Sequence, residues 1–174
     1  MTTPTQVLRE EHRLIVRALD TLEIAGDRVG RGAPLPDHWW SDLIHWLRAF
    51  ADRNHHAKEE RSLFPAMVKA GVPSDDGPIA VMLEEHSQGR ALIQSMETVE
   101  PAHRAATVRD YVALLRAHID KENQVVFPLA DAVLEEPAQK ALAREFDAIE
   151  AEQGHDASLE RAEAYIARLA AALG

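Results

Sequence analysis

Two stretches of the chain place the same residue types at the same spacing. The first runs His55-His-Ala-Lys-Glu59 and continues to Phe64-Pro65, and the second runs His118-Ile-Asp-Lys-Glu122 and continues to Phe127-Pro128. Residues i and i+4 share one face of a helix, with Cβ atoms about 6 Å apart. Each stretch therefore presents an imidazole beside a carboxylate, and two such pairs could hold a binuclear metal site.

Each of these stretches is preceded by another copy of a shared motif. Glu10-Glu11-His12 comes before the first stretch, and Glu84-Glu85-His86 comes before the second. Six ionisable side chains then fall on stripes that are otherwise apolar, and burying them unpaired would be very costly. Metal ions would resolve that cost. The predicted metal ligands are His12, His55, Glu59, His86, His118 and Glu122.

Helical periodicity dominates the elements that must position these residues. Thr3, Pro4 and Gln6 are typical of a capping box at the start of a helix that ends near Gly30. Further helices are expected from about 37, 78 and 101, with Pro65 and Pro128 predicted to kink or end two of them. Two shorter helices follow from about 137, and no strand pattern is found.

These elements predict an all-α protein, an up-down four-helix bundle with a C-terminal two-helix extension. We expect residues 1–134 to form the bundle and residues 135–174 to form an extension packed on the same domain. In such a bundle the six predicted ligands converge on the axis.

The donor types restrict the metal. The chain has no cysteine, so thiolate sites, iron–sulfur clusters and disulfides are excluded. Nitrogen and oxygen donors suit iron or manganese, with zinc as a further alternative. Zinc usually takes four ligands in a closed site, so two iron ions fit the ligand number better than two zinc ions.

The register of the second helix is open to a second interpretation, because His56 and Glu60 also stand four positions apart. The Phe-Pro offset matches the other stretch only for His55 and Glu59, which favours that pair. His56 could still be a further ligand, but a half-exposed place behind the ligands is preferred. Glu60 is likewise expected behind the ligands, beside His56.

Two more residues could lie just outside the ligands. Tyr111 is about two turns before His118 and could bond to a metal-bound oxygen, although a core aromatic is the favoured interpretation. Arg90 is one turn after His86 and could reach a bridging carboxylate or an anionic ligand. A salt bridge at the end of the bundle is an equal alternative for Arg90.

The chain resembles the hemerythrin-like family, the HHE cation-binding domains. The resemblance rests on the six predicted ligands, the Phe-Pro pairs and the stretch Glu-His-Ser-Gln-Gly-Arg at 85–90, and it covers roughly Leu8 to Pro128. It implies a four-helix bundle around a non-haem di-iron centre. It also implies that Glu59 and Glu122 bridge the irons, with a further oxo or hydroxo bridge.

The chain departs from the oxygen-carrying members, which place two histidines one turn apart on the third helix. Here Met82 and Arg90 occupy the positions one turn from His86. Four histidines and two glutamates are one histidine fewer, and they resemble the ligands of iron-centre-repair proteins. The Cys-bearing N-terminal module of those proteins is absent from this sequence.

We therefore expect a protein that binds, senses or detoxifies oxygen, hydrogen peroxide or nitric oxide, with a catalase-like or nitric-oxide-consuming activity as one form of that role. The alternative is an iron-handling protein that stores or donates iron without turnover. A formal net charge of −10 argues against nucleic acid, and no apolar run is long enough for a bilayer. No signal peptide is evident, so a cytoplasmic protein is expected. We expect it to be a monomer or a homodimer.

Overall fold

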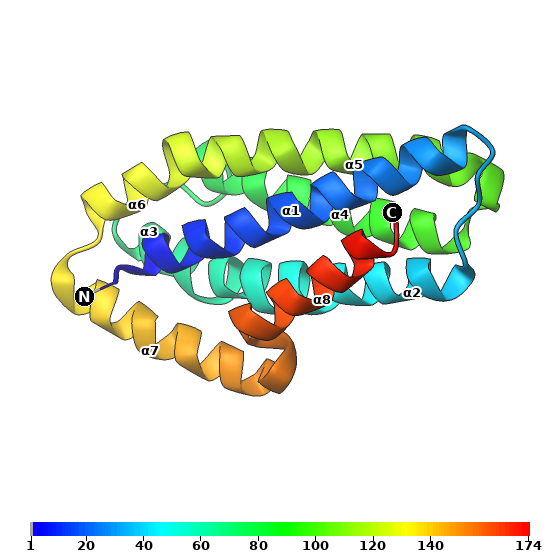
Figure 1. Cartoon of the computed structure of the whole chain (residues 1–174). Coiled ribbons are helices and arrows are strands. Elements are labelled where there is room, and N and C mark those ends of the chain that lie inside the picture. Colours follow the sequence, from blue (N-terminus) through cyan, green and yellow to red (C-terminus); the bar gives the residue numbers. More distant parts are fainter. Residues whose placement is uncertain (1) are drawn as a thin grey trace.

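The computed structural model describes residues 2–174, apart from the side chains of residues 101, 102, 155 and 156. The described residues are helical with short connections and contain no strand, which confirms the predicted all-α bundle. Four long helical arms lie side by side (Figure 1). The first two arms are α1 (Pro4–Gly30) and the succession α2 (Asp37–Trp46), η1 (Leu47–His56), η2 (Glu59–Leu63) and α3 (Phe64–Lys69).

The third arm is α4, and the fourth is α5 with its continuation. Their bounds are α4 (Gly77–Thr98), α5 (Pro101–Lys121), η3 (Glu122–Val126) and α6 (Phe127–Val133). The extension follows as α7 (Glu136–Gln153), the short 3₁₀ turn η4 (Gly154–Ala157) and α8 (Leu159–Ala171).

The start of α1 forms as predicted. The Thr3 side chain accepts from the Gln6 backbone, and the Gln6 side chain accepts from the Thr3 backbone, so the capping box is complete. Pro4 occupies the first turn, where its missing N–H costs nothing. This cap fixes the end of α1 that carries Leu8 and His12 into the core.

The two Phe-Pro pairs mark changes of helix type. We expected Pro65 and Pro128 to kink or end their helices, yet both arms continue, to Lys69 and Val133. A π-helical turn stands directly before each pair, at Glu59–Leu63 and at Glu122–Val126. The wider turn accommodates a proline that cannot donate to the α-helical ladder. Each predicted bridging glutamate is the first residue of one of these turns.

The core consists of two apolar clusters. The first contains Leu14, Ile15, Ala51, Ile93 and Leu115, and the second contains Leu8, Leu63, Met82 and Val126. On every arm, the predicted ligands fall between a residue of one cluster and a residue of the other. The bundle therefore holds a buried polar layer between two apolar layers.

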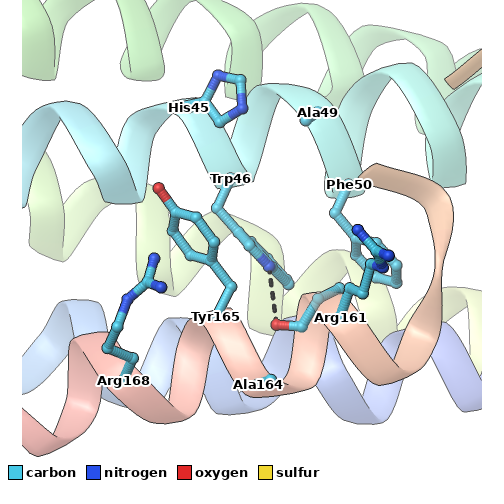
Figure 2. A pocket seen from close by; sticks show the side chains of 9 residues that line it. His45, Trp46, Ala49, Phe50, Arg161, Ala164, Tyr165 and Arg168 are labelled. Carbon is cyan, nitrogen blue, oxygen red and sulfur yellow. Dashed lines mark hydrogen bonds between the residues drawn. The ribbon is translucent and has the colours of Figure 1, made fainter. Parts of the chain in front are cut away.

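The C-terminal helix α8 covers a face of the bundle and contacts α1 and α2. Two buried indoles of α2 donate to its backbone, Trp39 Nε1 to Leu169 O and Trp46 Nε1 to Ala162 O, both at 3.1 Å. Figure 2 shows the second bond at the floor of a pocket of about 300 Å³ between α8 and the α2–η1 arm. Trp39 and Trp46 thus stabilise the contact between the bundle and the extension.

Within the described residues, no helix combines the length and the apolar character needed to cross a membrane.

Candidate metal centre

The polar layer brings all six predicted ligands together. One group contains His12, His55, Glu59 and Glu122, and a second contains His56, Glu59, His86 and His118. In each group, one candidate ligand atom per residue lies within 4.8 Å of the others, and every residue is buried. Glu59 belongs to both groups, and Glu122 of the first group also lies 3.3 Å from Nε2 of His118 in the second.

His56 lies among the candidate ligands and not behind them, which differs from the preferred expectation. Its ring stacks on the His86 ring with centroids 3.9 Å apart, and its exposed fraction is 6%. Asn54, His55 and His56 all lie at the end of η1, a π-helical stretch in which the 3.6-residue period no longer holds. Adjacent histidines can therefore both reach the axis.

The buried polar atoms of the layer fit a metal centre. Nε2 of His12 and of His55 and both carboxylate oxygens of Glu59 and Glu122 are buried without a hydrogen bond among the described residues. Nε2 of His86 and Nε2 of His118 point at each other at 3.1 Å. Such atoms are costly to bury unless something binds them, and imidazole nitrogens with carboxylate oxygens are donors suited to iron.

The other nitrogen, Nδ1, is hydrogen-bonded from outside in four of the five imidazoles, and His56 Nδ1 is the exception. Nδ1 of His55 donates to Glu11 (2.8 Å), Nδ1 of His86 to Glu60 (2.7 Å) and Nδ1 of His118 to Glu85 (2.9 Å). His12 Nδ1 donates to the Asn123 side-chain oxygen at 3.1 Å. His56 Nδ1 lies 3.5 Å from Asp52. Metal-binding histidines usually have such partners, which fix the ring and direct Nε2 at the metal.

A cation stands behind each of these acceptors. Lys58 binds Glu11, Lys121 binds Glu85, and Arg9 donates to Asn123. Arg90 binds both Glu60 (2.6 Å) and Asp52 (2.7 Å). These cations keep the acceptors ionised or oriented, so the imidazoles are held by charge-assisted contacts.

The layer alters the proton affinities of its members. Burial would lower the pKa of His86, but the Glu59 carboxylate 3.4 Å from its Nε2 and the hydrogen bond to Glu60 raise it to about 9. Burial would raise the pKa of Glu122, yet the His118 and His12 imidazoles keep it well below its usual range. His56 differs, because burial and then the charge of His86 hold its pKa well below the ordinary value. A lowered pKa favours the neutral imidazole, the form that binds metal.

An internal twofold correspondence relates the two halves of the site. The residues of one half have counterparts in the other half, at the same sequence offset and with the same kind of contact. The pairs are His12 and His86, Glu11 and Glu85, Lys58 and Lys121, and Asn123 and Glu60. The Phe-Pro pairs belong to the same pattern, since Phe127 stacks on His12 (5.2 Å between centroids) and Phe64 on His86 (6.1 Å). His56 breaks the correspondence, because Ile119 stands at the matching position.

Four residues of this arrangement differ from their expected places or were not anticipated. Glu11 and Glu85 were not among the predicted site residues, yet Glu11 is 1% exposed and both accept hydrogen bonds from imidazoles. Lys58 and Asn123 were not anticipated at all. The signal was present in the repeat itself, since the glutamate before each lone histidine and the lysine before each predicted bridging glutamate both recur.

Of the three remaining residues that were expected beside the ligands, two lie behind His86 and one lies in the apolar core. Glu60 and Arg90 lie directly behind His86, so Arg90 reaches the site through Glu60 and Asp52. Tyr111 is 1% exposed within the first apolar cluster, outside both groups of candidate ligands. Burial and the Asp52 charge raise its pKa. Its position agrees with the core interpretation.

The fold and the site define a helical-bundle protein with a buried layer of histidine and glutamate. Residues 3–130 match the family described as Hemerythrin HHE cation binding domain, and the chain belongs to that family. The chain is also 34% identical over 90 residues to an iron-sulfur cluster repair protein, YtfE, of Cronobacter sakazakii (strain ATCC BAA-894). That similarity covers 44% of this chain and only 40% of the relative.

Proposed function

We propose that the protein holds two iron ions in the polar layer and uses them to bind, sense or detoxify a small oxidant such as oxygen, hydrogen peroxide or nitric oxide. One observation carries the proposal. Seven buried candidate ligand residues form two groups that share Glu59, and the inward atoms of His12, His55, Glu59 and Glu122 lack hydrogen bonds among the described residues. Membership of the cation-binding family supports the same conclusion.

In this proposal Glu59 and Glu122 would be the carboxylates shared by the two ions. The first group contributes two imidazoles, from His12 and His55, and the second contributes three, from His56, His86 and His118. The six ligands expected from the sequence did not include His56. With His56 added, the proposed ligands are five histidines and two glutamates. The first group is the poorer in imidazoles and has more room for an external ligand.

Bound iron would supply the redox chemistry and the affinity for small oxidants. The contribution of the chain is to orient the imidazoles through Glu11, Glu60 and Glu85 and to exclude bulk water. The apolar clusters on both sides limit access to small molecules, since all ligand residues are at most 6% exposed.

The proposal is tested by measuring metal content and oxidant consumption. Protein expressed in iron-replete medium should contain two irons per chain and show near-ultraviolet absorption that shifts on adding peroxide or nitric oxide. Oxygen evolution from peroxide would identify an enzymatic role. Iron-loaded protein that neither binds nor consumes any of these oxidants would contradict the oxidant role.

A second function is favoured by one observation, the similarity to a protein named for iron-sulfur cluster repair. The chain would then store or donate iron without turnover. Transfer of iron to an apo iron–sulfur acceptor, at a rate above release to buffer and without oxidant consumption, would support iron handling. Equal rates with and without the acceptor would count against it.

A further inference from the structure

The C-terminal extension reaches the metal centre through one buried side chain, Lys58. Its exposed fraction is 0%, and its Nζ binds Glu11 of α1 and, at 2.6 Å, Glu150 of α7. The Phe146 ring of α7 lies 5.7 Å from the same Nζ. Since Glu11 accepts from His55 Nδ1, a continuous series of contacts joins the outer helix α7 to a candidate ligand.

The internal correspondence of the site provides a comparison. Lys121 is the counterpart of Lys58, and it binds Glu85 as Lys58 binds Glu11. The Lys121 side chain is 43% exposed, whereas that of Lys58 is completely buried. Helix α7 packs along η1 and η2 and therefore encloses one of two equivalent lysines, Lys58.

Charge explains why the enclosure matters. A buried ammonium needs close anions, and Lys58 divides its charge between Glu11 and Glu150. If Glu150 were neutral, the whole charge would act on Glu11. Glu11 would then be a weaker acceptor for His55, and the His55 ring would be held less firmly. The opposite half has no such dependence on α7.

We propose that α7 is a part of the metal centre, in which Glu150 acts through Lys58 and Glu11 to position His55 and to retain the metal of the His12 and His55 group. The proposal rests on the proposed function, because it requires bound metal. Glu150 lies beyond residues 3–130, so the C-terminal extension contributes this role and not the family-matched region.

The chain offers a matched control two residues away. Glu152 is also on α7 and forms an ion pair with Arg61 on the surface, 2.7 Å between Arg61 Nη1 and Glu152 Oε2. The variants Glu150→Gln and Glu152→Gln make the same chemical change on the same helix. Only the first touches the Lys58 contact.

The experiment measures iron release from the intact chain, reconstituted with two Fe(II), to a ferrous chelator. For Glu150→Gln we expect one of two release phases to be roughly threefold to tenfold faster, a smaller effect than loss of a direct histidine partner. Glu152→Gln should release iron as the wild type does. Melting curves of the metal-free variants should agree, which separates metal positioning from general stability.

Equal release from Glu150→Gln and the wild type would overturn the inference, as would equal acceleration in both variants. Acceleration of both release phases together would also overturn it, because the contact joins only one group. If the wild-type chain binds no iron, the proposed function itself fails, and that outcome is distinct from all three.

Discussion

At the scale of single residues, Glu59 occupies the central place in the site. It belongs to both groups of candidate ligands, it is fully buried, and neither of its oxygens has a hydrogen bond among the described residues. Each of the other six candidate ligands belongs to one group only. The effect of a substitution on metal content should therefore depend on which group the residue serves.

Glu59→Ala should lower the content of both metals, because a shared carboxylate is removed from both groups. His12→Ala should chiefly affect the first group and leave a chain with about one metal. Metal analysis of the two purified variants at equal protein concentration measures the difference. Retention of two metals by Glu59→Ala would show that the bridging assignment is wrong.

His56 is the residue on which sequence and structure differ most. If it is a ligand, His56→Ala should weaken binding in the second group by at least the 10- to 100-fold typical of losing a histidine's outer partner. His38→Ala, at an exposed position in the first turn of α2, is the matched control. Titration with Fe(II) in competition with a chelator gives both affinities. Identical Fe(II) affinities in the two variants would mean that His56 lies behind the ligands and does not bind metal.

At the scale of elements, the sequence predicted what depends on regular periodicity. Leu8, His12 and Ile15 follow the 3.6-residue period, so the face of α1 that enters the core was correctly identified, as was its capping box. The Phe-Pro offset gave the register of His55 and Glu59. The π-helical stretch before His56 follows a different period, and no local signal predicts it.

The acceptors behind the histidines could not be found from single helices. Glu11 follows Glu10 in sequence, yet the Glu10 side chain is 50% exposed and that of Glu11 is 1% exposed. The difference arises from Asn54 and Lys58, which reach Glu11 from another arm of the bundle. Only the packing of two arms distinguishes the two glutamates.

The contact between α1 and α5 gives a prediction for the packing of the arms. A Cβ at Gly26 would lie 2.7 Å from Val108 Cγ1, too close without a shift of the helices. Gly26→Ala should destabilise by about 1–3 kcal/mol through overpacking, less the roughly 0.5–1 kcal/mol gained in helix propensity. Urea denaturation measures the net change in the free energy of unfolding.

Gly89→Ala is the control for that substitution. Its added Cβ would meet Leu115 Cδ2 at 3.5 Å, an ordinary contact, so propensity should dominate and the protein should gain up to about 1 kcal/mol. If Gly26→Ala were as stable as Gly89→Ala, the close approach of α1 and α5 would be contradicted.

At the scale of the whole molecule, metal and fold should stabilise each other. The polar layer separates two apolar clusters, and without metal the buried Glu59 and Glu122 carboxylates face only imidazoles among the described residues, the nearest being His12 Nε2 at 3.0 Å from Glu122 Oε2. Binding at a thousand times the dissociation constant adds about 4 kcal/mol. A chain of this size should then lose roughly 10 °C in melting midpoint on metal removal.

Calorimetry before and after exhaustive chelation measures this shift, and adding Fe(II) back should restore the original midpoint. A midpoint that does not move would mean that the bundle is equally stable without metal in its polar layer.

The division of the molecule into a bundle that ends at residue 134 and an extension that begins at residue 135 stays a prediction. In the structure, α8 of the extension packs on α1 and α2.

The central claim, a binuclear iron centre in the polar layer, is tested most directly by counting iron in the purified chain. Elemental analysis with protein quantified by amino-acid analysis, combined with Mössbauer spectroscopy of ⁵⁷Fe-loaded protein, should give two irons per chain in coupled, inequivalent sites. A chain that takes up no iron, or a single uncoupled iron, from iron-replete medium and after reconstitution would contradict the claim.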